Sequence, residues 1–318
     1  MPSARETEVL IKAARLYYEE GRTQSEVAAE LEVSRSNVSR ILTQARQQNL
    51  VEIIIHDPFE SPSRVVELER QLMDRFGLGE AHVLLRRGDD TIASVARAAA
   101  QMLRDRATSV GSIGISWGHT LQTVAAVLEP GRLNPAPRLL PLVGGLDALD
   151  TMRSGDSVLR VIAEKLGTNP EPFYAPALVE SAAAYRAFLE QTVIRDAINA
   201  AAAVETAFVG IGSHGLYSSR RLVAGMHLTK DELATFLAAD PTGDICGRFV
   251  SRDGAPLGLP TTERVVGVTF EQLRAMPEVI GVAAGEAKVE GVLAVLRSTV
   301  LNALVVDSGL AAAVLEHA

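Results

Sequence analysis

The sequence contains a single cysteine, Cys246, among its 318 residues, which excludes a framework of internal disulfides. A chain of this kind is typical of a reducing compartment, and we expect a cytoplasmic protein. The N-terminal residues are polar and charged, with no apolar segment of the kind found in signal peptides. No uncharged apolar run is long enough to cross a bilayer, so the sequence predicts no membrane partner.

An excess of positive charge is also missing. The formal net charge is −8, and residues 1–57 carry 7 basic and 9 acidic side chains, a balance of 7 − 9 = −2. We therefore do not expect general binding of polyanions, and any positive field must be local to one helix. Apolar residues make up 47% of the sequence, enough for a sizeable core, and the length suggests about two domains.

Residues 23–50 have the pattern of two short helices joined by a tight turn. Thr23 and Glu26 have the spacing of a capping box, and Ser34 is a good N-cap for a second helix. Apolar residues at i, i+3, i+4 and i+7 give that second helix a single buried stripe, namely Val38, Ile41, Leu42 and Ala45. This pattern is typical of a helix-turn-helix, whose second helix enters the major groove of DNA.

The polar face of the second helix carries side chains suited to DNA. Arginine can bind guanine edges through two bonds, serine and asparagine bind bases or phosphates, and a helix N-terminus attracts phosphate. The alternative is an ordinary helical hairpin with a solvated polar face. Glu32 argues mildly for it, because a left-handed backbone in the turn costs a non-glycine residue about 1 kcal/mol. We predict DNA contacts from Thr23, Gln24, Ser34, Arg35, Ser36, Asn37, Ser39 and Arg40.

The flanks of this motif set the expected domain boundary. A helix over Glu6–Glu20 completes a small helical core, and Val51–Ile55 is a strand, a wing or the exit from the domain. Prolines at positions 58 and 62 predict a linker, and an amphipathic helix is expected over Ser63–Phe76. We therefore expect a DNA-binding domain over residues 1–57. An effector-binding and oligomerisation domain would then span residues 58–318.

Beyond residue 77, short apolar strands alternate with helices. This alternation indicates an α/β domain with a mostly parallel sheet covered on both faces. Expected strands are Ala81–Leu85, Ser112–Ser116, Arg138–Val143, Thr206–Ile211, Arg264–Thr269, Val279–Ala283 and Ala303–Val306. Expected helices include Thr91–Arg104, Thr120–Leu128, Ser157–Leu166 and Val289–Arg297.

Ligands of such sheets bind beyond the carboxyl ends of the strands. Three junctions there are rich in glycine and hydroxyl residues, which can hold phosphate or sugar oxygens but also make ordinary turns and caps. None has the G-x-G-x-x-G spacing of a dinucleotide site. Residues of these junctions that are candidates for effector binding are Ser116, Trp117, Gly118, His119, Thr120, Gly144, Gly145 and Gly212.

Two charged residues complete the candidate site. Lys288 is expected where a helix begins, and a cation there opposes the helix dipole and needs a partner. Glu286 or Glu290 can supply that partner, and so can an anionic ligand. Asp244 is the best carboxylate for sugar hydroxyls, although an aspartate after a glycine often only makes a turn. We predict no metal site and no cofactor.

Blocks across nearly the whole chain resemble the SorC family of bacterial sugar-binding transcriptional regulators. The N-terminal blocks are Ala14–Gly21, Thr23-Gln24 and Ser34–Arg40, and the later ones are Gly114–Leu121, Leu142–Gly145, Gly210–Ser213, Gly243–Phe249 and Gly285–Lys288. The resemblance implies an effector domain similar to glucosamine-6-phosphate deaminase and ribose-5-phosphate isomerase that has lost catalysis. It also implies a sugar, sugar phosphate or polyol effector, operator DNA as partner, and a dimer or tetramer.

The sequence departs from the family pattern in two places, and both leave the effector's identity open. Ala284-Gly285 replaces the usual glycine pair, and Val143 offers no amine for a covalent adduct with a sugar.

Two other functions compete with an effector-controlled regulator. An active sugar-phosphate isomerase or deaminase would need Asp244 and Lys288 as acid–base and charge-stabilising groups. An architectural DNA-binding protein would not explain the acidic charge or the large second domain.

Overall fold

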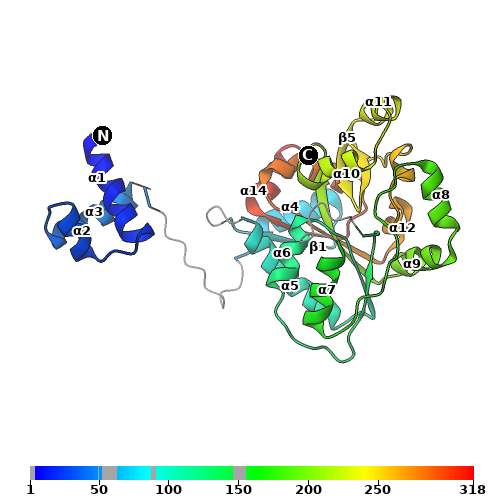
Figure 1. Ribbon diagram of the computed structural model, residues 1–318, viewed down its shortest axis with the longest axis horizontal. Helices are drawn as coiled ribbons and strands as arrows, with labels where there is room; N and C mark the ends of the chain where they lie inside the picture. The colour runs from blue at the N-terminus through cyan, green and yellow to red at the C-terminus, as the bar shows by residue number, and fades with distance from the viewer. Residues whose placement is uncertain (1–3, 49, 52–62, 87–90, 146–154) are drawn as a thin grey trace. The chain divides into compact units, whose positions relative to one another are not determined.

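The computed structural model describes residues 4–48, 50–51, 63–86, 91–145 and 155–318. Contacts divide the chain into two compact units, residues 1–60 and 61–318 (Figure 1). The predicted wing at Val51–Ile55, apart from its first residue, and the predicted linker lie outside the described residues. Among the helices in these ranges, none has the length and apolar character needed to span a membrane.

The smaller unit is helical. Its elements are α1 (Ala4–Ala14), the π-helical turn η1 (Arg15–Glu19), α2 (Gln24–Glu30) and α3 (Arg35–Gln47). The predicted helix over Glu6–Glu20 is therefore divided by the π turn into two segments. The stripe predicted on the second helix is buried and packs with residues of α1, η1 and α2, in a core of Leu10, Ala13, Leu16, Val27, Ala28, Val38, Ile41, Leu42 and Ala45.

Side-chain caps fix both helices of the motif. The Glu26 amide donates to the Thr23 hydroxyl at 3.3 Å, and the Glu26 carboxylate accepts from the Thr23 amide at 2.8 Å, which confirms the capping box. Ser34 caps α3 by accepting from the Asn37 amide at 3.2 Å. Glu32 has a φ of 53°, so the turn has the left-handed backbone expected there.

The larger unit is an α/β sandwich around an eight-stranded sheet. Six strands pair in parallel in the order β1-β8-β7-β4-β2-β3, and β5 and β6 add an antiparallel hairpin to β4. The strands are β1 (Glu80–Leu84), β2 (Ser112–Ile115), β3 (Arg138–Pro141), β4 (Thr206–Ser213), β5 (Pro241–Ile245), β6 (Arg248–Ser251), β7 (Glu278–Val282) and β8 (Ala303–Asp307).

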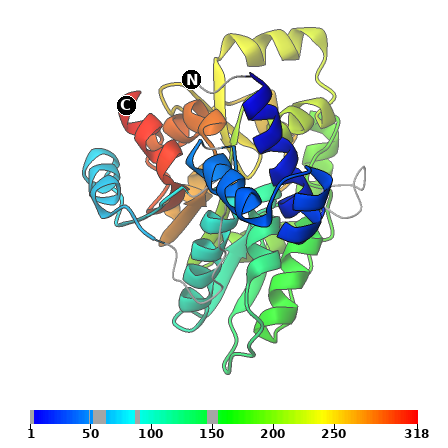
Figure 2. The same ribbon diagram turned by 90° about the vertical axis from the view of Figure 1, so that its left-hand side faces the viewer.

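Alternate strand residues enter two separate cores, as a sheet covered on both faces requires. Phe208 and Ile280 face α5, α6 and α7, whereas Val209 and Val279 face α4, α13 and α14. Figure 1 shows α5, α6 and α7 together, and Figure 2 shows α4 beside α14. The helices are α4 (Val66–Phe76), α5 (Thr91–Ala107), α6 (His119–Val127), α7 (Gly155–Leu166), α8 (Ala182–Glu190), α9 (Thr192–Ala202), α10 (Tyr217–Gly225), α11 (Lys230–Ala238), α12 (Phe270–Ala275), α13 (Val289–Arg297) and α14 (Ser308–Glu316), with short 3-10 turns η2 (Thr261–Glu263) and η3 (Glu286–Lys288).

The strand predicted over Arg264–Thr269 is wrong. Its residues make only isolated bridges. The buried guanidinium of Arg248 donates hydrogen bonds to four backbone carbonyls between residues 262 and 268, at 3.0–3.1 Å. A side chain therefore satisfies carbonyls that a neighbouring strand would otherwise bind. The helix expected over Ser63–Phe76 begins only at Val66, because residues 63–65 run along β1.

Candidate functional site

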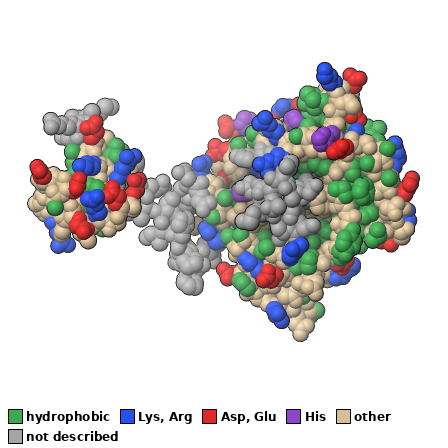
Figure 3. Space-filling view, in the orientation of Figure 1, with side chains coloured by type: hydrophobic (Ala, Val, Ile, Leu, Met, Phe, Trp, Pro, Cys, Tyr) green, Lys and Arg blue, Asp and Glu red, His purple; other side chains and the backbone are tan. Residues whose placement is uncertain are grey.

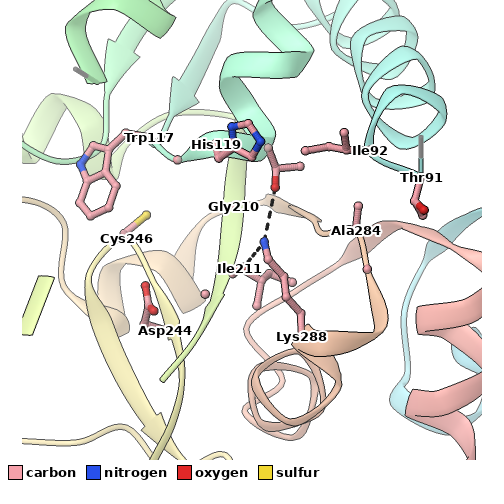
Figure 4. Close-up of a pocket in the computed structure, with 14 residues that line it drawn as sticks. Thr91, Ile92, Trp117, His119, Gly210, Ile211, Asp244, Cys246, Ala284 and Lys288 are labelled. Carbon is pink, nitrogen blue, oxygen red and sulfur yellow. Dashed lines mark hydrogen bonds between the residues drawn. The ribbon is translucent and has the colours of Figure 1, made fainter. Parts of the chain in front are cut away.

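A cavity of about 280 Å³ lies at the carboxyl ends of β2, β4 and β7 (Figure 4). This is the edge where ligands of open α/β sheets bind. The start of α5, the β2–α6 junction, the end of β4, the β5–β6 hairpin and the turn before α13 contribute its walls. The lining residues are Thr91, Ile92, Trp117, Gly118, His119, Thr120, Gly210, Ile211, Gly212, Asp244, Cys246, Ala284, Gly285 and Lys288.

Lys288 is the cation of this cavity. Its ammonium group donates to the Ile211 carbonyl at 3.0 Å and to the Thr120 hydroxyl at 3.4 Å (Figure 4). Burial lowers the pKa of Lys288, and the Asp244 carboxylate partly opposes that shift. The two acids that the sequence offered as partners bond elsewhere, Glu286 with Arg86 and Glu290 with Arg252. The lysine is thus held by neutral oxygens inside the cavity.

Asp244 is the carboxylate of the cavity. It lies in β5, paired with Gly212 of β4, and is only 5% exposed. The Ser219 hydroxyl donates a hydrogen bond to Oδ1. Burial raises the pKa of Asp244 to about 6, against the opposing effects of the Ser219 bond and the Lys288 charge. Near neutral pH this group can exchange a proton or accept hydrogen bonds from hydroxyls.

Two glycines shape the backbone beside Lys288. Gly118 immediately precedes α6 with a φ of 135°, and no side chain caps that helix. The first amides of α6 therefore keep the bonding capacity that an anion can use. Gly285 has a φ of 91° and turns the chain into η3. Residues with side chains rarely adopt these angles, so glycine is needed at both turns.

The other end of the cavity is apolar. Trp117 is 7% exposed and Cys246 3% exposed, and both lie on the side of the cavity away from Thr91 (Figure 4). Burial raises the pKa of the Cys246 thiol to about 12, so it stays neutral. The indole nitrogen lies on the ring edge turned away from Lys288, and it is buried with no hydrogen-bond partner among the described residues.

The structure brings together seven of the ten residues predicted for the effector: Trp117, Gly118, His119, Thr120, Gly212, Asp244 and Lys288. Ser116 is placed elsewhere, since its buried hydroxyl accepts from the Gly210 amide at 3.1 Å and so joins β2 to β4. Gly144 and Gly145 are not among the lining residues either. A β-carbon on Gly144 would lie 2.5 Å from the Ala175 carbonyl, so the glycine permits close backbone packing there.

Sequence reasoning missed other lining residues. Thr91 and Ile92 carry no motif and line the cavity because α5 starts at its edge (Figure 4). Cys246 has a positive φ of 52° and precedes Gly247 at 72°, in the hairpin turn between β5 and β6. Consecutive left-handed residues are the signature of a tight hairpin turn. The Cys-Gly pair was the one available signal for this feature.

In the smaller unit, α3 presents the predicted polar face. Arg35, Ser36, Ser39 and Arg40 are exposed, and the Arg40 guanidinium donates to the Asn37 side-chain oxygen at 2.9 Å. Thr23 and Ser34 serve as caps, and Gln24 is the first residue of α2. Basic and acidic side chains are interspersed on the face shown in Figure 3. The described residues contain no group of three or more His, Cys, Asp or Glu able to hold a metal ion.

A helix-turn-helix unit followed by an α/β unit with a sugar-sized cavity, lined by Lys288 and Asp244, defines a class of effector-controlled DNA-binding regulator. Comparison with known families agrees with this class. Residues 60–316 match the Sugar-bind family of sugar-binding domains, and residues 3–48 match region 4 of sigma-70. The chain belongs to the SorC family of sugar-binding transcriptional regulators.

Relatives align over nearly the whole chain. The chain is 27% identical to the deoxyribonucleoside regulator of Bacillus subtilis (93% of this chain, 94% of the relative). It is also 27% identical to the sorbitol operon regulator of Klebsiella pneumoniae (96% and 97%). The crystal structure of the full-length sorbitol operon regulator SorC from Klebsiella pneumoniae superposes with a TM-score of 0.71 at 26% identity, covering 98% of this chain and 100% of that one.

Proposed function

We propose that α3 binds operator DNA and that the cavity binds a sugar phosphate, which changes the affinity for the operator. The observation that carries the effector assignment is the environment of Lys288. Its ammonium group is half-buried and held by the Ile211 carbonyl and the Thr120 hydroxyl, beside a helix start without a side-chain cap. A phosphate would give this cation a charged partner and would use the free amides of α6.

The remaining lining residues favour a sugar attached to that phosphate. Asp244 can accept hydrogen bonds from hydroxyl groups, and the Trp117 ring can cover the apolar C–H face of a sugar. A volume of about 280 Å³ is at the small end of ligand pockets, which fits one sugar unit better than two. An unphosphorylated polyol is the competing effector, and it would leave Lys288 with a structural role.

The DNA contacts are assigned to the exposed face of α3 and the two helix starts. Arg35 and Arg40 would bind base edges or phosphates, with Ser36, Asn37 and Ser39 between them. Thr23, Gln24 and Ser34 would bind phosphates at the N-termini of α2 and α3. One helix-turn-helix buries little surface, so we propose at least a dimer on two half-sites. Such a regulator would act in the cytoplasm, where bacterial operators lie.

A thermal-shift panel of matched compounds tests the effector assignment. Ribose 5-phosphate, fructose 6-phosphate and glucosamine 6-phosphate are compared with their unphosphorylated sugars and with sorbitol. We expect a selective rise of the melting temperature with a phosphorylated member. The same compound should change the footprint of the protein on DNA upstream of its own gene. Stabilisation by unphosphorylated compounds alone would contradict the phosphate assignment, and an unchanged footprint would contradict effector control.

A sugar-phosphate isomerase or deaminase is the second candidate, favoured by the raised pKa of Asp244. A carboxyl group with a pKa of about 6 is suited to proton transfer near neutral pH. However, Asp244 is the only carboxylate among the described residues that line the cavity. We therefore expect binding without turnover. Nuclear magnetic resonance of each panel compound incubated with the protein checks this, and conversion of any of them would favour the enzyme.

A further inference from the structure

The chain enters the larger unit along the edge of its sheet. We call residues 63–65 the linker root, because they follow the predicted linker. The Val65 amide donates to the Val83 carbonyl at 2.8 Å, and the Leu85 amide donates to the Ser63 carbonyl at 2.8 Å. An isolated antiparallel bridge forms between these two hydrogen bonds. The linker root therefore extends the sheet beyond its edge strand, β1.

An ion pair between the partly exposed Arg64 and the buried carboxylate of Glu69 holds the linker root in this place. The Arg64 guanidinium donates to both carboxylate oxygens of Glu69, at 2.6 and 2.9 Å, and also to the Ala81 carbonyl at 3.0 Å. Glu69 is 3% exposed and accepts from the Val83 amide at 2.9 Å. Removal of the arginine would leave a buried carboxylate without its cation, which is strongly unfavourable.

The carboxyl end of β1 reaches the turn that carries Lys288. We call residues 284–288 the pocket turn. The Arg86 guanidinium donates to the Glu286 carboxylate at 2.8 Å, and the Arg86 amide donates to the Ser308 hydroxyl at 3.1 Å. Glu286 lies in the pocket turn but does not line the cavity. The adjacent residue, Leu85, is bonded to the linker root, so two hydrogen bonds and one peptide unit connect the turn to Ser63.

A second connection runs through β8. The Gly285 amide donates to Asp307 Oδ2 at 2.7 Å, and Asp307 Oδ1 caps α14 by accepting from the Leu310 amide at 3.0 Å. Asp307 is 1% exposed and stands opposite Leu84 in the pairing of β8 with β1. Both connections therefore end at the carboxyl end of β1, which is the strand bonded to the linker root.

We propose that the contact of Glu286 with Arg86 positions the linker root according to the occupancy of the cavity. This inference rests on the function proposed above. An anion in the cavity competes with the Ile211 carbonyl for the ammonium of Lys288, two residues after Glu286. The pocket turn then differs between the empty and occupied states, as any ligand that shifts an equilibrium requires. The Arg86 pair passes this difference to residues 63–65 and so to the DNA-binding unit.

Contact alone does not establish coupling between the cavity and the operator-binding face, so the test measures how the compound changes operator affinity. Operator affinity of the full-length chain is measured by fluorescence anisotropy with and without the panel compound that stabilises it most. The stronger of these two operator affinities is divided by the weaker, and this ratio is compared for wild type, Glu286→Gln, Arg86→Gln and the double variant. Arg70→Gln is the matched control, since Arg70 makes exposed ion pairs with Glu67 and Asp74 on α4. Calorimetry gives the affinity of each protein for the compound.

Glu286→Gln and Arg86→Gln should each lower the ratio about two- to fivefold, the range for an exposed ion pair. The double variant should lose no more than either single one, because both remove the same contact. Affinity for the compound and for the operator alone should stay within about twofold of wild type. In wild type the compound should also change hydrogen exchange at the Val65 and Leu85 amides, and Glu286→Gln should remove that change.

A wild-type ratio above one that survives in both single variants would overturn this inference while leaving the proposed function intact. A wild-type ratio of one would overturn the proposed function together with the inference. An equal fall of the ratio in Arg70→Gln would show a general effect of surface charge and would also overturn the inference.

Discussion

Asp244 lies directly against the backbone of Gly212. The two residues pair between β5 and β4, and a β-carbon on Gly212 would be 2.0 Å from Asp244 Oδ1. The position of the cavity's carboxylate therefore depends on the absence of a side chain on the neighbouring strand. This relation links the glycine-rich end of β4 to the carboxylate of the neighbouring strand β5.

Gly212→Ala should destabilise the larger unit by about 1–3 kcal/mol, because the buried carboxylate has no room to give way. Chemical denaturation measures the free energy of unfolding. Gly258→Ala is the control, since a β-carbon there meets nothing within 4 Å, and we expect a change within about 0.5 kcal/mol. Equal stability of Gly212→Ala and wild type would show that Asp244 can move without cost.

Lys288→Ala should weaken binding of the effective sugar phosphate by about 10- to 150-fold, the range for a lost charged hydrogen bond. Calorimetry with a phosphorylated sugar and its unphosphorylated counterpart separates the phosphate contribution from the rest. Lys230→Ala, at an exposed lysine of α11, should bind like wild type. If Lys288→Ala binds the phosphorylated compound as tightly as wild type does, the phosphate site is wrongly assigned.

Arg40→Ala should weaken operator binding by about 1–3 kcal/mol while leaving binding of the sugar phosphate unchanged. The guanidinium is exposed on α3 and oriented by its bond to Asn37. Gel shifts with Arg35→Ala and Arg15→Ala complete the set. Arg15 is a control, because it is exposed on η1, outside the helix-turn-helix. Unchanged operator affinity in both the Arg35 and the Arg40 variants would contradict the assigned DNA face.

The stability of the larger unit should depend on the ionisation of Asp244. Its folded pKa of about 6 is above the ordinary value of 3.8, so folding favours the protonated form. The stabilisation is fully present below the unfolded pKa and is lost as the pH rises through about 6. Between pH 4 and pH 7, wild type should lose up to about 3 kcal/mol relative to Asp244→Asn. Parallel pH profiles of the two proteins would contradict the burial effect.

Light scattering checks the proposed assembly. Helix-turn-helix proteins usually pair across two half-sites, so we expect at least a dimer at micromolar concentration. A monomeric mass would contradict the proposal.

The sequence predicts the elements that are determined by interactions between residues close together in the chain. The stripe on α3 and the Thr23 and Ser34 caps act within a few residues, so periodicity and spacing suffice to locate them. The same is true of the apolar parallel strands. Lys288 was identified for a local reason too, since a cation at a helix start needs a partner.

The failures share a different cause, which is contact between residues distant in the sequence. The β5–β6 hairpin contains Pro, Gly and Asp, which are poor strand formers, and it exists because β4 pairs with it. The strand expected over Arg264–Thr269 is bound instead by Arg248. Gly144 and Gly145 resemble a ligand loop in sequence, yet they serve close packing against residues 175–177. No local pattern distinguishes these outcomes.

Trp117 has a spectroscopic consequence. It is the only tryptophan of the sequence, and it lies in the cavity wall beside Cys246. In the described part of the smaller unit the aromatic side chains are Tyr17 and Tyr18, which contribute no indole emission. Indole emission therefore originates from a single place in the molecule, next to the proposed effector. The natural chain carries an optical probe of that cavity, and binding can be followed in the unlabelled protein without mutation or dye.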